Sequence, residues 1–488
     1  MADGRKLGIK LLALVMAFGV WAALLSPSVE ARDQKRYGYP VSPGVRFRLY
    51  RLSGPNKVRV LSFNVGAATI DTVLAANNPG RERVSSMARR TRAIAAVNGD
   101  YSRPSGRPMH TFARDGRLDL TPAMISGTGV PYYGRNFSVD KRKENVFMTH
   151  PWPRSWIWMP GDESDVSYRV NRVNDPSIQK QAKRQIRAFT SAARRSELPP
   201  HGGCYVHLRP TDSSRATDAT HAPRLRGRLL ASVGVERKHV VDKRRCNRPR
   251  IAPKGGITLY SPLRGVYAGA LRSMKVGRKV SFGWSLGWPN VFDTVGGNPT
   301  LIEDRVVQKQ SIYGGSPMVS GRHPRTAVAF NARSKRVSLV TVDGRQPRYS
   351  RGMTLARLTR FCRKRLGATD ALNLDGGGST TMVVKGKIRG RPSDGSERAV
   401  SSALVVLRGR DPGEPRLSRP YPSISGLLPE DSEAPVTPSS VTPYDEMVQD
   451  PASVGGLAAW LDHQGHDLPR FLEQAADDFR GSRGPITD

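Results

Sequence analysis

The stretch Ala371–Val384, ALNLDGGGSTTMVV, constrains the fold of this chain more than any other. A strand-like apolar run ends on the carboxylate of Asp375, three glycines follow, and a second apolar run comes after Ser379 and Thr380. Glycines readily adopt positive φ, and consecutive amides in such a loop can form a concave anion site. The stretch therefore predicts either a carboxylate beside a phosphate cradle, or a hairpin whose glycines only satisfy turn geometry.

Two strands and a helix are predicted immediately before this loop. Arg325–Phe330 and Val337–Val342 are strand-like, and the second run ends in Asp343 and Gly344. Thr354 can cap a helix that ends at Gly367 and has one apolar face, made by Leu355, Leu358, Phe361, Cys362 and Leu366. This strand–helix–strand unit brings Asp343 and Asp375 to strand ends, where functional sites are commonly assembled.

Four segments, in this order and spacing, resemble the phosphodiester glycosidase family: Arg325–Ala327, Val342–Arg345, Gly352–Leu355 and Asn373–Ser379. Three further segments also resemble the family pattern: Ala96–Tyr101, Thr294–Leu301 and Arg391–Val400. The resemblance covers roughly residues 55 to 408 and is strongest from 294 to 408. At Asp100 the chain departs from the family pattern, which has a second glycine there.

The resemblance implies a hydrolase that cleaves the sugar C1–O bond of a sugar-1-phosphodiester in an anionic glycan or exopolysaccharide. Such a leaving group is already acidic, so the two-carboxylate requirement of ordinary glycosidases relaxes. Asp375 is the first choice for the catalytic carboxylate and Asp343 is the second. The expected phosphate-binding residues are Arg325, Thr326, Gly376, Gly377, Gly378, Ser379 and Thr380. The expected substrate-binding residues are Asn98, Gly99, Asn373 and Arg398.

Each of these residues also has a purely structural interpretation. Asp343 with Gly344, and Asn98 with Gly99, are turn-forming pairs. Arg325 and Arg398 can serve as ion-pair partners, and Asn98 and Asn373 either bind sugar hydroxyls or order the loops around them. The sequence leaves these alternatives open.

The charge of the chain is extreme, at +37, and unevenly placed. Residues 180–250 hold 18 Lys and Arg against 5 Asp and Glu, whereas residues 411–488 hold 5 Arg against 14 Asp and Glu. A basic body of this kind favours an anionic glycan, a cell wall or a membrane surface as partner, or the charge is only solvated surface. No nucleic-acid-binding motif is recognisable, so nucleic acid is not expected as a partner.

Two rival functions are weighed against the glycosidase. A metal-dependent phosphodiesterase that cleaves P–O would need His and Asp clusters, and the nine histidines are scattered. No cofactor is predicted, although a single divalent cation such as Ca²⁺ on carboxylate and backbone oxygens stays open. The other rival is a non-catalytic protein that binds the cell wall or another polyanion.

The chain divides into five predicted parts. Residues 1–31 form a signal peptide, with Arg5 and Lys6 before the apolar run Leu11–Leu25; an uncleaved anchor is the alternative, and either predicts a secreted or envelope protein. Residues 32–54 are predicted to be a linker. An α+β catalytic domain, rich in strands of a mixed sheet and with few helices, spans 55–408, with a basic, irregular elaboration at 180–250. An acidic, Pro- and Ser-rich disordered linker at 409–455 precedes a tail at 456–488 with a short amphipathic helix.

Three cysteines fit an extracellular protein. Cys204 and Cys246 can close a loop within the basic region, and Cys362 is expected to be a buried free thiol on the apolar face of its helix.

Overall fold

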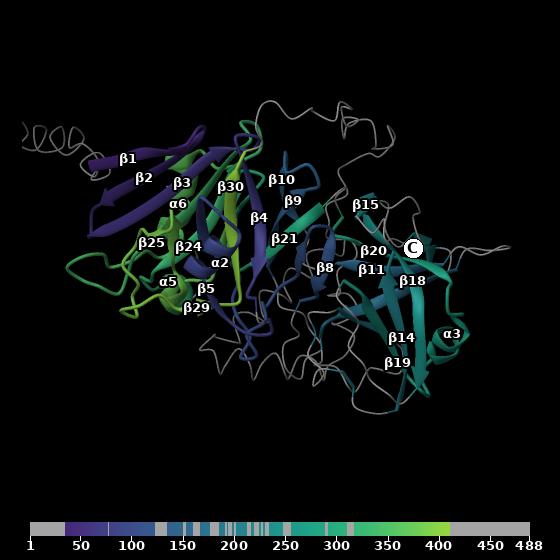
Figure 1. The fold of residues 1–488 in the computed structure, drawn as a ribbon. Coiled ribbons are helices and arrows are strands. Elements are labelled where there is room, and N and C mark those ends of the chain that lie inside the picture. The colour runs from purple at the N-terminus through teal and green to yellow at the C-terminus, as the bar shows by residue number, and fades with distance from the viewer. Residues whose placement is uncertain are drawn as a thin grey trace, which may run out of the picture.

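Strands dominate the structure, as Figure 1 shows. The computed structural model describes residues 35–409, apart from 77, 123–133, 150–152, 160–165, 176–184, 191–192, 194–197, 200–201, 212–215, 219–223, 226–227, 230–233, 247–254, 288–290 and 310–316. The predicted α+β class, rich in strands with few helices, is confirmed. The predicted signal peptide, nearly all of the 409–455 linker and the tail lie outside the described residues. Within them, no helix is long and apolar enough to cross a membrane.

The central layer is an antiparallel sheet of eight strands in the order β1-β2-β3-β25-β24-β26-β22-β23. Its strands are β1 (Lys35–Ser42), β2 (Val45–Leu52), β3 (Asn56–Asn64), β22 (Thr300–Glu303), β23 (Val306–Val307), β24 (Arg325–Asn331), β25 (Arg336–Val342) and β26 (Asp370–Leu374). The prediction of a linker at 32–54 is wrong for its described part. Residues 35–52 form the edge hairpin β1–β2, because Val45, Phe47 and Tyr50 all find buried positions in the core.

Helix α6 (Leu355–Leu366) covers one face of this sheet. Its predicted caps are confirmed: the Thr354 side chain accepts a hydrogen bond from the Arg357 amide at 3.2 Å, and Gly367 has a φ of 63°. Cys362 is a buried free thiol, as expected, and burial raises its pKa to about 12. Together with α5 (Pro317–Ser320), α6 covers the apolar residues of β3, β24 and β25.

Two five-stranded sheets cover the opposite face, and their apolar residues join the central sheet in one core. One has the order β10-β9-β21-β7-β8, with β7 (Phe112–Arg114), β8 (Arg117–Leu120), β9 (Arg135–Asp140), β10 (Val146–Thr149) and β21 (Val291–Gly297). The other has the order β28-β27-β6-β30-β4, with β4 (Ala68–Leu74), β6 (Ala95–Asn98), β27 (Met382–Val384), β28 (Lys387–Ile388) and β30 (Ser402–Arg408). Helix α2 (Val84–Arg90) and the short pair β5 (Glu82–Arg83) and β29 (Ala399–Val400) lie beside this second sheet.

The predicted irregular elaboration at 180–250 contributes regular strands to a separate sheet, seen at the lower right of Figure 1. Its strands are β11 (Arg154–Met159), β12 (Val166–Val173), β13 (Ile186–Thr190), β14 (Gly203–Pro210), β15 (Thr217–Asp218), β18 (Val235–Cys246), β19 (Ile257–Pro262) and β20 (Lys279–Ser285). Strand β18 pairs with both β20 and β14, so seven strands close into a ring around a second core. The Cys204–Cys246 disulfide joins β14 to β18 at this closure. Helix α3 (Ala268–Ser273) packs on β14 and β19, and β16 (Arg224–Leu225) pairs with β17 (Arg228–Leu229).

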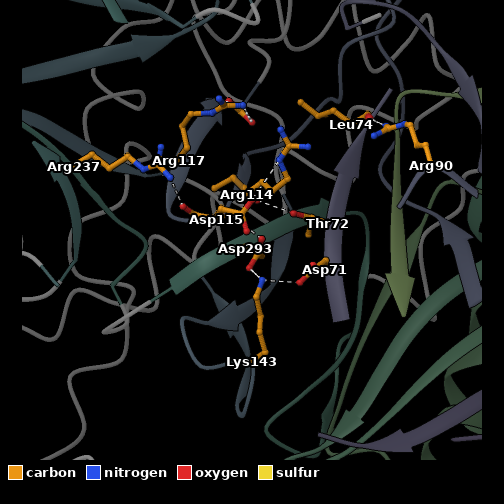
Figure 2. A network of polar contacts seen from close by, with 12 residues as sticks. Asp71, Thr72, Leu74, Arg90, Arg114, Asp115, Arg117, Lys143, Arg237 and Asp293 are labelled. Carbon is orange, nitrogen blue, oxygen red and sulfur yellow. Dashed lines mark hydrogen bonds and ion pairs between the residues drawn. The ribbon is translucent and has the colours of Figure 1, made fainter. Parts of the chain in front are cut away.

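A polar network joins the closed ring to the body of the protein (Figure 2). Lys143, after β9, forms ion pairs with Asp71 of β4 at 2.7 Å and with the fully buried Asp293 of β21. Asp293 also accepts a hydrogen bond from the Asp115 amide at 3.1 Å, and Arg237 of β18 donates to the Asp115 carbonyl at 2.8 Å. This network fixes the ring against the sheet that contains β21.

Candidate functional site

The Asp375 loop connects two different sheets. Strand β26 belongs to the central sheet, and β27 pairs with β6 in the other layer. Between them, Gly377–Ser379 forms one turn of 3₁₀ helix, and Gly377 has a φ of 60°, which favours glycine. The hairpin interpretation is therefore wrong, and the loop crosses the gap between the two layers.

Asp375 is a partly exposed residue at this crossing. The Ser379 hydroxyl and the Gly376 amide hydrogen-bond to it, and the backbone amide of Asp375 donates to the Gly99 carbonyl at 3.1 Å. Burial raises the pKa of Asp375 to about 6; the nearby charge of Asp100 acts in the same direction, against the opposing effects of Ser379, Arg398 and Gly376. A reachable carboxyl group that titrates near neutrality is a candidate for acid–base or nucleophilic chemistry.

The backbone hydrogen bonds of the loop argue against the expected phosphate cradle. The Gly377 amide donates to the Pro324 carbonyl at 3.0 Å, the Ser379 amide to Gly376 at 3.2 Å, and the Thr380 amide to Gly377 at 3.2 Å. Together with the contacts of Gly376 and Ser379 to Asp375, these bonds engage the amides of Gly376, Gly377, Ser379 and Thr380 and the Ser379 hydroxyl within the protein.

Arg325 is also corrected. Its side chain is buried, and its guanidinium donates to the carbonyls of Met353 and Gly321, each at 3.0 Å, and to that of Met318. Burial lowers its pKa to about 10. Arg325 therefore holds neighbouring backbone segments together, rather than presenting an open fork to phosphate.

Asn98 orders the loop, which decides between its two expected roles. Its side-chain nitrogen donates to the Asp375 carbonyl at 2.6 Å. Its side-chain oxygen accepts from the Thr326 hydroxyl at 2.8 Å and from the Thr381 amide at 3.1 Å. Thr326, expected to bind phosphate, is fully buried and forms part of this scaffold. Gly99 contributes through the carbonyl that receives the Asp375 amide.

Asn373 lies two residues before Asp375 in the chain. Its side chain contacts Tyr101, which the sequence analysis did not select as a site residue. The Asn373 side-chain nitrogen donates to the Tyr101 hydroxyl and to the Asn298 carbonyl, each at 2.8 Å, and the Tyr101 hydroxyl donates to the same carbonyl at 2.9 Å. Burial and the charge of Asp375 raise the pKa of Tyr101. The position of Tyr101 directly after Asn98–Asp100 was the sequence signal that could have identified it.

Two arginines flank the glycines of the loop. Arg398 is half exposed, forms an ion pair with Asp394, and packs so closely on Gly378 that no Cβ would fit there. Arg345 is exposed, and its guanidinium lies against Gly377, 3.2 Å from where a Cβ would stand. Arg345 was missed as a site residue although it directly follows Asp343 and Gly344.

Asp343, the second choice for the catalytic carboxylate, is buried in an ion pair. Its Oδ2 lies 2.6 Å from Nη1 of Arg59 and accepts the Arg391 amide at 3.3 Å. The side chain is 4% exposed, so the pair is shielded from solvent. The structural interpretation of Asp343 is therefore favoured over the catalytic one.

Within the described residues, no three His, Cys, Asp or Glu side chains gather as a set of metal ligands. A hollow of about 620 Å³ lies at the β1–β2 hairpin, lined in part by Arg46, Arg48 and Arg336. None of the predicted site residues lines it.

The family resemblance is confirmed by a match of residues 231–407 to the family model described as phosphodiester glycosidase. The match includes Asp375 and both flanking arginines but not Asn98–His110. An 85-residue stretch is 39% identical to the SPbeta prophage-derived uncharacterized protein YomE of Bacillus subtilis. That stretch spans 17% of this chain and only 13% of YomE.

Three solved structures are similar. A hypothetical protein from Synechocystis has 18% identity and a TM-score of 0.51, covering 75% of this chain and 62% of that one, and shows that the fold is shared. A putative exported protein from Burkholderia pseudomallei has 23% identity and a TM-score of 0.49, covering 73% and 74%. The zebrafish N-acetylglucosamine-1-phosphodiester alpha-N-acetylglucosaminidase catalytic domain, auto-inhibited by its pro-peptide, has 14% identity and a TM-score of 0.37, covering 78% and 92%.

Proposed function

We propose that this chain hydrolyses the sugar C1–O bond of sugar-1-phosphodiesters in an anionic glycan or exopolysaccharide, with Asp375 as the reacting carboxylate. The family match supports a glycosidase-type hydrolase. The observation that carries the residue assignment is a partly exposed aspartate with a pKa of about 6, in a loop whose next two glycines, Gly377 and Gly378, lie against Arg345 and Arg398.

One carboxylate is enough for this chemistry. The departing phosphate monoester is a stable anion and needs little protonation, so the work lies in stabilising charge. Above pH 6, ionised Asp375 would stabilise the positive charge that develops on the sugar, and would direct a water molecule to C1 or attack it. Asp343 takes no part, because its carboxylate is held by Arg59.

The leaving phosphate needs cations, and we assign them to Arg345 and Arg398. Both guanidinium groups lie against loop glycines where a larger residue would displace them. Asn373 and Tyr101 complete the polar rim beside Asp375. We prefer these two arginines to Arg325 and the loop amides, because the Arg325 guanidinium and most of the loop amides are engaged within the protein.

The closed ring is the proposed contact with an anionic polymer. Strand β18 carries the exposed residues Lys238, Lys243 and Arg244, and the exposed Lys279 lies on β20, which pairs with β18. Lys275, also exposed, lies in the turn just before β20. The disulfide in this ring fits a protein of an oxidising compartment, consistent with the proposed secretion to the cell envelope. The same surface is the observation that favours the second candidate, a non-catalytic polyanion-binding protein.

The test is hydrolysis of a panel of methyl phosphodiesters of sugar 1-phosphates in ¹⁸O-labelled water, with the Asp375→Asn variant as control. Label in the released sugar, lost in the variant, supports the glycosidase. Label in the phosphate would instead identify a phosphodiesterase. Absence of turnover, together with salt-sensitive glycan binding that Lys243→Gln and Arg244→Gln weaken, would favour the binding protein.

A further inference from the structure

The hollow at the β1–β2 hairpin is the second concave feature of this protein, and it contains none of the predicted site residues. Its volume of about 620 Å³ lies in the range of ligand-binding sites. Its lining combines apolar with cationic side chains, which include Val41, Val45, Phe63, Arg46, Arg48 and Arg336. Such a lining suits a ligand that carries apolar groups next to negative charges, because each kind of group then meets its counterpart.

The register of the central sheet brings two of these arginines to the same face. Val340 of β25 packs with α6, and alternate side chains of a strand share a face, so Arg336 lies on the α6 face. Arg336 pairs with Asn64 of β3. Arg46 of β2 pairs with Ser62, which is two residues before Asn64. The two arginines therefore project from the same face, on strands separated by β3 alone.

The strands around the hollow contain no acidic residue that could balance the arginines. Residues 35–64, which include β1, β2 and β3, hold seven Lys and Arg and no Asp or Glu. Residues 325–342, which include β24 and β25, hold four Lys and Arg and no Asp or Glu. Arg46 and Arg336 are exposed and form no ion pair with another described residue. A concave surface with such cations attracts an anionic partner.

The described part of the chain ends beside this hollow. Strand β30 runs to Arg408, which pairs with Ala68. A Cβ added to Gly409 would stand 2.6 Å from the carbonyl oxygen of Ala67, and one added to Gly44 would overlap the Cβ of Ala67. Gly409 and Gly44 thus pack against the same residue, and Gly44 lines the hollow. The residues after Gly409 therefore begin at its rim.

The sequence that follows is acidic where the hollow is basic. Residues 420–469 hold eight Asp and Glu and no Lys or Arg. Within them, the segment Ile424–Glu433, ISGLLPEDSE, has an Ile and two Leu directly before Glu430, Asp431 and Glu433. The 14 residues between Gly409 and this segment can span about 50 Å when extended, so the segment can reach the hollow.

We propose that the acidic segment Ile424–Glu433 docks in the hollow at the β1–β2 hairpin of its own chain. Its three carboxylates face Arg46, Arg48 and Arg336, and its apolar side chains cover the apolar part of the lining. Because the segment is tethered at Gly409, its effective concentration at the hollow is on the order of millimolar, so modest contacts are enough. The hollow is then filled by the chain itself, and this docking does not depend on the chemistry proposed for Asp375.

The experiment is photo-cross-linking in the full-length chain. Asn64→Cys places one reactive thiol at an exposed position of the hollow, because Cys362 is buried and Cys204 and Cys246 form a disulfide. The thiol carries a benzophenone, and mass spectrometry identifies the peptides that it captures on irradiation. We expect capture of residues 424–433. The same label at Lys238→Cys, an exposed position of β18 in the closed ring, should not capture them.

Charge variants separate docking from general attraction between a basic body and an acidic tail. Neutralising the three carboxylates of the segment should lower capture by about tenfold, because three exposed ion pairs are lost. This variant combines Glu430→Gln, Asp431→Asn and Glu433→Gln. The matched control removes the same charge further along the chain and should leave capture unchanged. It combines Asp445→Asn, Glu446→Gln and Asp450→Asn.

Several results would overturn the proposal. One is absence of capture, or capture of other parts of the chain in place of residues 424–433. Another is an equal loss of capture in the two acidic variants. In a mixture of ¹⁵N-labelled and unlabelled protein, capture only between molecules would assign the hollow to the tail of a second copy. If Asn64→Cys does not fold, Pro43→Cys places the label on the exposed hairpin turn that also lines the hollow, and the same criteria apply.

Discussion

Asp343 and Asp375 stand in almost the same setting and have opposite properties. Each ends a strand of the central sheet and is followed by glycine; β25 and β26 flank β24, so the two aspartates lie at one sheet edge, about 10 Å apart by strand spacing. Asp343 lies 2.6 Å from the Arg59 guanidinium. Asp375 has no ion pair within the described part of the chain, and burial raises its pKa to about 6.

The difference shows that an Asp-Gly pair at a strand end can have either a structural or a reactive role. A buried carboxylate with its own arginine contributes to the native structure and offers nothing to a ligand. An aspartate whose carboxylate receives only a hydroxyl and an amide, in a partly exposed position, is costly to ionise, which is the state expected of a reacting group. Removing each carboxylate should therefore change different properties of the protein.

The largest expected effect is on turnover. Asp375→Asn should reduce kcat/KM on a sugar-1-phosphodiester by about 1,000-fold, within the range for a reacting acid or base, because the amide cannot take part. Asp343→Asn should leave kcat/KM within about threefold of wild type wherever the protein is folded, since this carboxylate does not face substrate. Equal losses in both variants, with both folded by circular dichroism, would abolish the distinction.

The next effect is on stability and falls on the other carboxylate. Arg59→Met leaves Asp343 buried without its cation, which should lower the free energy of unfolding by about 3 kcal/mol. Urea denaturation measures this loss, and Arg59→Met combined with Asp343→Asn should recover part of it because no charge is left buried alone. A single variant as stable as wild type would show that the pair contributes nothing.

Asp375→Asn should raise the free energy of unfolding at neutral pH, whereas Arg59→Met lowers it. The pKa of Asp375 is raised from 3.8 to about 6 by folding, so the unfolded chain loses this proton first, and wild-type stability falls as the pH rises from about 4 through 6. The full difference corresponds to about 3 kcal/mol, and partial exposure reduces it to about 2 kcal/mol. The variant should therefore be more stable than wild type at pH 7 and nearly equal to it at pH 4. A gap that does not depend on pH would contradict this.

Local features of the fold could be predicted from the sequence. Helix α6 was found with both caps because Thr354, Gly367 and the apolar face between them lie within one short segment. The position of Asp375 directly after a strand was predicted for the same reason. The closed ring was missed because its strands are defined by partners distant in the chain. The β1–β2 hairpin was missed although its two strands are neighbours in the chain and Val45, Phe47 and Leu49 alternate with arginines.

The sequence predicted which residues surround Asp375 but not which of them are engaged within the protein, and long-range contacts explain why. The bond from Thr326 to Asn98 joins residues 228 apart, and the bond from Asn98 to Asp375 joins residues 277 apart. Arg325 looked available for phosphate because no sequence pattern reveals that three carbonyls surround its guanidinium. Motifs identify which residues meet, whereas burial decides which of them remain open to a ligand.

The smallest expected effect is that of replacing Arg345, which is close to Asp343 in sequence and to the Asp375 loop in space. It follows Asp343 and Gly344 in the chain, yet its guanidinium lies against Gly377 of the Asp375 loop. If it stabilises the leaving phosphate, Arg345→Ala should lower kcat/KM by about tenfold, the order expected for one charged contact, and leave the urea midpoint unchanged. Arg348→Ala, which removes an exposed arginine three residues further on, should change neither. A loss of stability without a loss of turnover would assign Arg345 to the structural side with Asp343. A loss of turnover without a loss of stability would place Arg345 in the reacting site, even though it follows Asp343, which takes no part in the reaction.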